Sequence, residues 1–287
     1  MTLDPLTDSA ADPGLKARRP GPTTRTRVTE LTEDAEAPRE DRIATEEPLE
    51  LRLAWPGGAA RRIWVTMRTP GNDFELAAGY AVAEGLVPEA GLRTVAYCTD
   101  ADLTPDQEFN VVTVTLAAPP ARDPGHRHGS YGAGSACGVC GKDSIAEVLE
   151  VPRASRWADA VPTPDVVRRL PALLREQQTT FARTGGVHAA GLVTADGAIL
   201  AVREDVGRHN AVDKVIGSRL LAGESPATAC LVISGRAGFE LVQKAVATGM
   251  GSLVAVGAPT SLSVQLAREA GLVLYGFTGA DRCVRYA

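Results

Sequence analysis

The sequence contains one closely spaced pair of thiols, Cys137 and Cys140, in the glycine-rich stretch 134–142. Apolar residues at helical spacing follow in 145–149, so we expect the thiols near the first turn of a helix. Unpaired backbone N–H groups and the helix dipole favour negative charge there, and Lys142 adds a cation. The pKa of a thiol in this setting should fall, which increases the fraction of thiolate, the form that attacks sulfur or binds metal.

A C-x-x-C pair alone is compatible with half of a zinc site, a redox disulfide or a sulfur-handling thiol pair. Zinc would need two further ligands, and His126 and His128 lie upstream in the sequence. The preceding segment 117–135 is rich in Pro, Gly, Arg and His and has no apolar period. A thioredoxin-like motif normally follows a buried strand directly. The pattern therefore favours a mobile nucleophilic arm over a stable redox dithiol, with structural zinc as a less favoured alternative.

The densest run of charge and imidazole extends from Arg203 to Lys214, after an expected strand and into an expected helix. Ligands commonly bind at such turns in open α/β sheets. In one interpretation Arg203, Arg208 and Lys214 hold phosphates. His209 or Asn210 would then contact a base or donate a proton. The alternative is a salt-bridged loop and helix start, but the position at a turn favours the binding role.

Ser234 and Arg236 occupy a second strand-to-helix turn, with small residues that let backbone N–H groups approach an anion. Lys244 lies further along the helix that follows. A third turn carries Thr260 and Ser261, for which helix capping is the simpler interpretation. Three such turns on one sheet edge would suit an anionic, nucleotide-like ligand.

Strand-like and helix-like patterns alternate in the C-terminal part of the chain. The expected strands are 229–234, 253–256 and 272–275, and the expected helices are 210–221, 239–248 and 261–269. This alternation indicates an α/β layer structure around a largely parallel sheet. A further helix, expected from residue 164, contains Pro171, which should kink or split it.

The N-terminal part has a different pattern. Alternating apolar residues in 49–53 and 63–67 flank a Pro-Gly-Gly turn and predict a hairpin. The elements expected after it are a helix that ends at Gly85 and strands at 95–97 and 109–116. Residues 1 to about 40 contain few large apolar side chains, so we expect a disordered tail, with folded structure from about Ile43.

The composition excludes several classes of protein. The chain has 287 residues, a net charge of −5 and 44% hydrophobic residues, which fits a soluble globular protein and gives no sign of a nucleic-acid binder. No apolar run approaches the length of a membrane span, and the N-terminus lacks the apolar core of a secretory signal. The five cysteines are therefore expected to be reduced thiols in a cytoplasmic protein.

Taken together and in this order, the motifs resemble the FdhD family, the formate dehydrogenase accessory proteins. The resemblance covers about Ile43 to the C-terminus. Its motifs are 69–76, the cysteine stretch 137–142, 184–190, 203–217, 234–236, 258–262 and 276–277. So many short motifs in one order are highly specific.

The resemblance implies a fold and an organisation. The fold is a cytidine-deaminase-like C-terminal α/β layer structure with a β-rich N-terminal portion and a flexible cysteine-bearing loop. Within 41–287, the N-terminal portion is 41–118, the cysteine loop and its helix are 119–160, and the deaminase-like portion is 161–287. A homodimer is also implied.

The resemblance further implies a sulfur carrier of the sulfurtransferase type rather than a metabolic enzyme. A cysteine desulfurase would place sulfane sulfur on Cys137, with Cys140 as its partner. The acceptor would be the molybdenum or tungsten bis(molybdopterin guanine dinucleotide) cofactor, before that cofactor enters formate dehydrogenase; no permanent metal is implied. The family's cofactor-binding segment falls on Phe277, Thr278, Gly279, Ala280, Asp281 and Arg282.

Two other functions are weighed against this one. A zinc-dependent nucleobase deaminase would need His-x-Glu and Pro-Cys-x-x-Cys. Here His188 precedes Ala189 and Ala190, and Ala136 stands in place of the proline, so deamination is disfavoured. His188 could equally be a buried, satisfied core histidine. The other candidate is a cofactor-binding chaperone in which the cysteines play no part.

Overall fold

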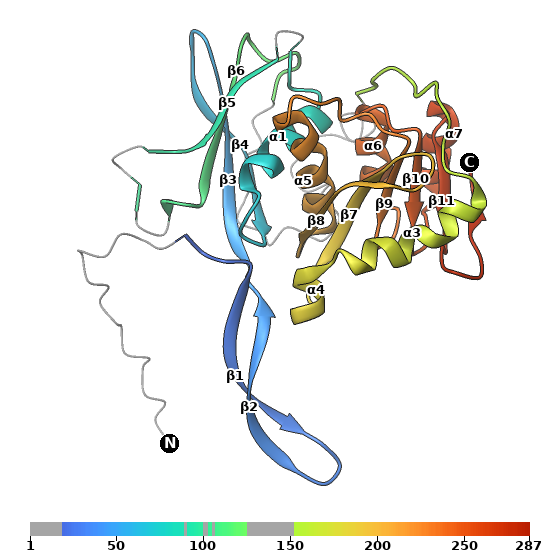
Figure 1. Cartoon of the computed structure of the whole chain (residues 1–287). Coiled ribbons are helices and arrows are strands. Elements are labelled where there is room, and N and C mark those ends of the chain that lie inside the picture. The colour runs from blue at the N-terminus through green and yellow to red at the C-terminus, as the bar shows by residue number, and fades with distance from the viewer. Residues whose placement is uncertain (1–18, 89–90, 100–102, 105–106, 125–151) are drawn as a thin grey trace.

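The computed structural model describes residues 19–88, 91–99, 103–104, 107–124 and 152–287. Within these ranges the strands form a two-stranded ribbon, a four-stranded sheet and a six-stranded sheet (Figure 1). None of the helices that the structure describes is long and apolar enough to cross a membrane.

The six-stranded sheet is the centre of the C-terminal half. Its strand order is β12-β11-β10-β9-β7-β8. The strands are β7 (His188–Val193), β8 (Ile199–Asp205), β9 (Cys230–Ile233), β10 (Ser252–Ala255), β11 (Val273–Gly276) and β12 (Val284–Arg285). β9, β10 and β11 are parallel, as the sequence predicted, whereas β7 is antiparallel to both β8 and β9.

Helices cover both faces of this sheet. α5 (Arg208–Leu221), α6 (Phe239–Ala247) and α7 (Ser261–Ala270) pack on one face, and α3 (Pro164–Glu176) packs on the other (Figure 1). A short helix, α4 (Thr179–Thr184), follows α3. α3 is one continuous helix through Pro171, with Val167, Leu170 and Leu174 buried against the sheet. This packing holds the helix together where the sequence alone left open a split.

The N-terminal half is a four-stranded sheet with one helix. β3 (Glu47–Trp55) and β4 (Gly58–Arg68) form the predicted hairpin, and β6 (Val111–Leu116) lies between β3 and β5 (Leu92–Tyr97). α1 (Asp73–Ala83) packs on the sheet. Alternate residues of β3, Leu49, Leu51 and Leu53, are fully buried beneath it, as the two-residue period of a strand requires.

The two halves meet where α1 crosses α5 (Figure 1). A Cβ placed on Gly79 would lie 1.8 Å from the backbone oxygen of Asp213, and one on Gly217 would lie 1.8 Å from the backbone oxygen of Glu75. No side chain fits at either position, so the two helix backbones are in direct contact. This contact fixes the position of the N-terminal sheet relative to the C-terminal layers.

Residues 1 to about 40 were expected to form a disordered tail. This expectation is wrong from residue 23 onward. β1 (Thr23–Leu31) and β2 (Glu36–Ala44) pair along their whole length as an antiparallel ribbon, which extends away from the rest of the molecule in Figure 1. Charged side chains of the ribbon pair across the strands, as Arg25 does with Glu40 at 3.2 Å. Residues 1–18 lie outside the described ranges.

Candidate binding site at the sheet edge

Five segments with polar residues meet at one edge of the six-stranded sheet. β9, β10 and β11 end there together, because Ile233 is level with Ala255 and Val254 with Tyr275. β7 begins and β8 ends at the same edge, where His188 pairs with Asp205. The inference that the strand-to-helix turns share one edge is thus confirmed. The site is built from the turns after β8, β9, β10 and β11, together with the start of β7.

The turn after β8 is fixed by a buried ion pair. Lys214 Nζ lies 2.6 Å from Asp205 Oδ2, and both side chains are buried. Asp205 also accepts hydrogen bonds from Asn210 Nδ2 and from the backbone N–H groups of Gly207 and Thr69. Burial raises the pKa of Asp205, and Lys214 opposes that rise. Lys214, considered above as a phosphate ligand, is therefore committed to holding the turn.

Arg203 and Lys244 also lie in ion pairs away from the edge. The Arg203 guanidinium donates to both oxygens of Glu75 on α1, and these hydrogen bonds raise the pKa of Arg203. Lys244 Nζ lies 2.7 Å from Asp213 Oδ1 on α5 and 5.4 Å from the centroid of the Tyr80 ring on α1. A cation in the dry interface of packed helices needs such a partner. The structure therefore does not bring these two residues together with the other predicted ligands.

Arg208 and His209 begin α5 at the edge. His209 Nε2 lies 3.0 Å from Glu240 Oε2, and burial lowers the pKa of His209 although Glu240 opposes this. Burial, and then the positive charge of Arg208, lower the pKa of His188. Both imidazoles are thus kept neutral near pH 7, each with one donor and one acceptor nitrogen.

The turn after β9 completes this part of the site. Ser234 Oγ accepts a hydrogen bond from the backbone N–H of Ala189, which leaves its O–H available to donate. A Cβ on Gly235 would lie 3.6 Å from His188 Nδ1, so the backbone here runs directly beside the imidazole. Arg236 is exposed at the edge.

The C-terminal segment 277–282 follows β11 at the same edge. Phe277 adopts a positive φ of 47° and is 43% exposed, an unusual combination for a large aromatic residue. Thr278 is only 4% exposed, and its hydroxyl has no hydrogen-bond partner within the described part of the chain. The Arg282 guanidinium lies 5.7 Å from the Phe277 ring centroid. Gly279 donates its backbone N–H to Arg282 O, which closes the turn over Ala280 and Asp281.

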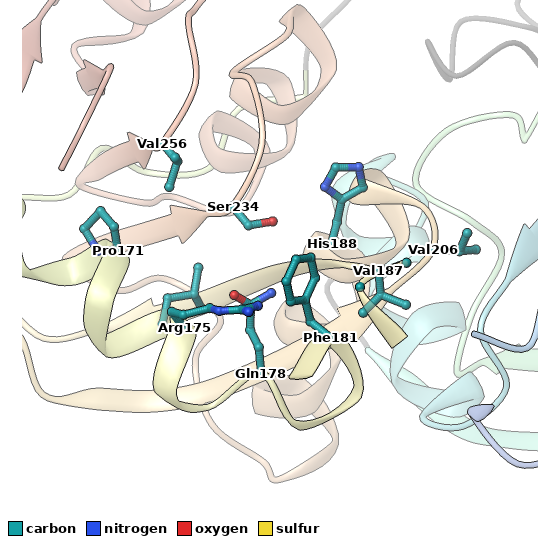
Figure 2. Close-up of a pocket in the computed structure, with 12 residues that line it drawn as sticks. Pro171, Arg175, Gln178, Phe181, Val187, His188, Val206, Ser234 and Val256 are labelled. Atoms are coloured by element: carbon teal, nitrogen blue, oxygen red, sulfur yellow. The ribbon is translucent and has the colours of Figure 1, made fainter. Parts of the chain in front are cut away.

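A cavity of about 590 Å³ lies on the α3 side of this edge. Figure 2 shows Arg175, Gln178 and Phe181 along one side of it, with His188 and Ser234 across from them. The sequence interpretation missed the first three residues. Their sequence positions, near the end of one helix and in the short helix that follows, carry no motif that marks a binding site.

A model of the FdhD/NarQ family matches residues 44–287. The chain belongs to the FdhD/NarQ family. The sulfur carrier protein FdhD of Nocardia farcinica is 48% identical to it over 259 residues, which cover 89% of each chain. That of Mycolicibacterium paratuberculosis is 46% identical over 262 residues, covering 90% of this chain and 94% of the relative. The resemblance stated from the motifs alone is thereby confirmed.

The fold of this FdhD/NarQ chain matches a crystal structure of a formate dehydrogenase accessory protein from Desulfotalea psychrophila. The TM-score is 0.68 and the sequence identity 20%, with 92% of this chain and 97% of the other covered. The similarity extends over both halves of the molecule and supports the mixed α/β architecture.

The cysteine pair of this FdhD/NarQ chain, Cys137 and Cys140, lies outside the described residues. Of the cysteines that are described, Cys98, Cys230 and Cys283, all are free thiols, and burial raises the pKa of Cys230 to about 12. A thiol with such a pKa is protonated at neutral pH and unreactive. Cys230 therefore serves as a packing residue beneath α3.

Proposed function

We propose that this chain is a cytoplasmic sulfur carrier that acts in the maturation of formate dehydrogenase. A cysteine desulfurase places sulfane sulfur on Cys137, and the carrier delivers it to the bis(molybdopterin guanine dinucleotide) cofactor before that cofactor is inserted. The names of the relatives support the carrier role. The cargo is supported by one structural observation: the sheet edge gathers hydrogen-bond donors and cations that lack carboxylate partners among the described residues.

The edge has the chemistry to hold a dinucleotide with pyrophosphate groups. α5 and α6 begin at Gly207 and Gly238, which have no side chain to cap the first-turn N–H groups. α7, in contrast, is capped by its own Thr260 and Ser263. Uncapped helix N-termini attract anions. Arg236 and Arg282 add exposed positive charge, and the unpaired hydroxyl of Thr278 can donate to a phosphate oxygen.

The two thiols have complementary roles in the proposed transfer. The desulfurase converts Cys137 into a persulfide. The Cys140 thiolate then attacks the inner sulfur of that persulfide, which forms a Cys137–Cys140 disulfide and releases the outer sulfur, with its bonding electrons, as hydrosulfide. The acceptor takes up the hydrosulfide, and a cellular dithiol reduces the disulfide before the next cycle.

Two further features belong to the same proposal. The strand order of the large sheet, with the antiparallel β7 between β9 and the edge strand β8, supports a cytidine-deaminase-like layer for 161–287. We also propose a homodimer, as the family resemblance implies.

The decisive experiment is intact mass spectrometry after incubation with a cysteine desulfurase and cysteine. Wild type is expected to gain the mass of one sulfur atom, and Cys137→Ala to gain none. Cys283→Ser, which removes a half-buried thiol outside the pair, is the matched control and should load like wild type. Loading that persists in the Cys137→Ala, Cys140→Ala double variant would refute the carrier role at these cysteines.

The chaperone alternative makes a different prediction in cells. A strain that lacks this protein is complemented with the double cysteine variant, and formate dehydrogenase activity is measured. The carrier proposal predicts no recovery of activity. Recovery to the wild-type level would show that cofactor binding alone suffices.

A further inference from the structure

The loop 69–72 joins β4 to α1 in the N-terminal half and lies against the turn after β8 in the other half. Thr69 is 2% exposed, and its backbone N–H donates to Asp205 Oδ2 at 3.1 Å. Its hydroxyl oxygen accepts a hydrogen bond from the backbone N–H of Val206, also at 3.1 Å. Its carbonyl oxygen accepts one from Lys214 Nζ at 2.8 Å. A single residue of the N-terminal half thus contacts three residues that form or support this turn.

Both ends of the loop are fixed within the N-terminal half. Arg68 precedes the loop and Asp73 follows it, and both side chains are fully buried. The guanidinium donates to both carboxylate oxygens, at 3.0 and 3.2 Å, and Tyr97 Oη donates to the same carboxylate at 2.7 Å. Between these ends Asn72 has a φ of 57°, in the left-handed region. A backbone conformation of this kind persists only where its surroundings determine it, so the loop is presented to the turn in one geometry.

The turn after β8 needs external support because its centre is a glycine. A Cβ on Gly207 would lie 2.9 Å from Asn210 Nδ2, so a larger residue does not fit there. Glycine restricts its own backbone less than any other residue does. Asp205 Oδ1 accepts a hydrogen bond from the Gly207 N–H at 2.8 Å, and Thr69 accepts the one from Val206. These two hydrogen bonds supply the restraint that the turn lacks by itself.

The turn leads directly into the sheet-edge site. Arg208 and His209 follow it as the first residues of α5. A Cβ on Gly235, in the turn after β9, would lie 3.6 Å from His188 Nδ1 and 3.9 Å from Arg208 Cδ, so both side chains approach the same point of the edge. Charge-assisted hydrogen bonds depend on distance and direction. A displaced turn would therefore move the Arg208 guanidinium out of its geometry for an anion.

We propose that Thr69 is a positioning residue of the site, which holds the turn after β8 so that Arg208 meets an anionic ligand at the sheet edge. Thr69 acts through Val206 and Asp205 and is not itself a ligand-contacting group. The inference rests on the proposed function. It gives the motif 69–76, which belongs to the N-terminal half, a part in holding the cargo.

Binding of guanosine diphosphate to the full-length protein tests this role. Thr69→Val keeps the branched shape of the side chain and removes the oxygen that accepts from Val206, whereas Thr69→Ser keeps an acceptor. Thr113→Val is the matched control, because it makes the same chemical change on β6, between Arg52 and Ala96 of the N-terminal sheet. Calorimetry well below the unfolding temperature of each variant gives the dissociation constant of the folded protein.

We expect Thr69→Val to weaken binding about fivefold and Thr69→Ser to stay within about twofold of wild type. Thr113→Val should bind like wild type. A residue that only stabilised the fold would lower the unfolding temperature and leave the dissociation constant of the folded protein unchanged. Wild-type affinity in Thr69→Val, or equal losses in the valine and serine variants, overturns the proposal. Thr69→Ala, which also removes the acceptor, keeps the test valid should Thr69→Val fold poorly.

A double-mutant cycle shows whether Thr69 acts through Arg208. Arg208→Met is measured alone and in combination with Thr69→Val. Because the guanidinium is already displaced in the valine variant, Arg208→Met should cost less affinity there than in wild type. Additive losses would show that the two residues act independently and would overturn the positioning role.

Failure of this inference and failure of the proposed function give different results. If wild type binds no guanosine diphosphate, the proposal for the cargo fails and the positioning role fails with it. If wild type binds and Thr69→Val binds equally well, only the positioning role fails. Loading of Cys137 by the desulfurase should be the same in wild type and Thr69→Val, since the loading step does not use the sheet edge.

Discussion

Positively charged side chains have opposite surroundings in two regions of this molecule. Where α1, α5, α6 and β8 meet, the buried cations each have a carboxylate partner, as in the pairs Lys214–Asp205 and Lys244–Asp213. Along the sheet edge and its cavity, Arg175, Arg236 and Arg282 are exposed and have no carboxylate partner among the described residues.

The difference separates cations that stabilise the fold from cations that are available to bind a ligand. A buried ion pair offsets its own desolvation only while both partners are present, so removing one of them is strongly destabilising. An exposed cation contributes little to folding and is available to an anionic ligand. Substitutions in the first region should therefore change stability, and substitutions in the second should change binding at constant stability.

The largest effect is expected at the crossing of α1 and α5. Gly217→Ala places a methyl carbon 1.8 Å from the Glu75 carbonyl oxygen, and a helix backbone cannot yield locally. We expect a loss of about 4 kcal/mol or more in the free energy of unfolding, measured by urea denaturation. Gly21→Ala is the control, since a Cβ there has open space. Equal stability of the two variants would mean that the helices are not in backbone contact.

A somewhat smaller loss is expected when a buried pair is broken. Lys214→Met leaves Asp205 buried without its partner and should cost about 3–5 kcal/mol. Arg236→Met, at the exposed edge, should stay within about 0.5 kcal/mol of wild type. Urea titrations of both variants compare the two regions directly. A similar loss in both variants would show that a buried, paired cation contributes no more to the free energy of unfolding than an exposed, unpaired one.

The sequence predicted the edge but not the pairing of its charges. Alternating strands and helices bring the turns after β9, β10 and β11 to one edge whatever their side chains, so Ser234 and Arg236 could be placed from local patterns. The carboxylate partner of Arg203, Glu75, comes from the N-terminal half, as does the Thr69 carbonyl oxygen that accepts a further hydrogen bond from Lys214. Only the folded contact of α1 with α5 reveals them.

The other differences have the same physical origin. The ribbon of β1 and β2 lacks an apolar core and is held by backbone pairing and cross-strand ion pairs, which composition does not report. Gln178 and Phe181 acquire their environment from Glu204 and the sheet edge, neither of which is adjacent in sequence. The local spacing of apolar residues predicts helices and strands well. Long-range pairing decides which polar residues remain available for a ligand.

A binding effect without a stability effect is expected at the C-terminal segment. Arg282→Ala should weaken the binding of guanosine diphosphate about tenfold, as the loss of one charge-assisted contact implies. The free energy of unfolding should not change. Calorimetry at two salt concentrations checks this, because wild type should show the steeper salt dependence. Loss of stability without loss of binding would show that Arg282 stabilises the fold and does not bind the ligand.

The smallest expected effect is a dependence of stability on pH. It arises from His209, which lies between the two regions. His209 is mostly buried at the start of α5, and burial lowers its pKa from 6.5. The unfolded chain therefore binds a proton more readily than the folded chain. The stabilisation is fully present above about pH 6.5 and is lost as the pH falls below that value towards the folded-state pKa.

His209→Gln keeps a donor for Glu240 but cannot be protonated. Between pH 7.5 and 5.5 the variant should lose less stability than wild type, by about 1 kcal/mol, in parallel urea titrations. Taking the difference between the two proteins removes the contribution of Asp213, whose pKa burial raises to about 7 and which therefore acts in the opposite sense. Parallel curves would mean that the His209–Glu240 pair keeps the imidazole charged at neutral pH. His209 would then belong with the paired cations of the helix interface rather than with the neutral hydrogen-bonding groups of the site.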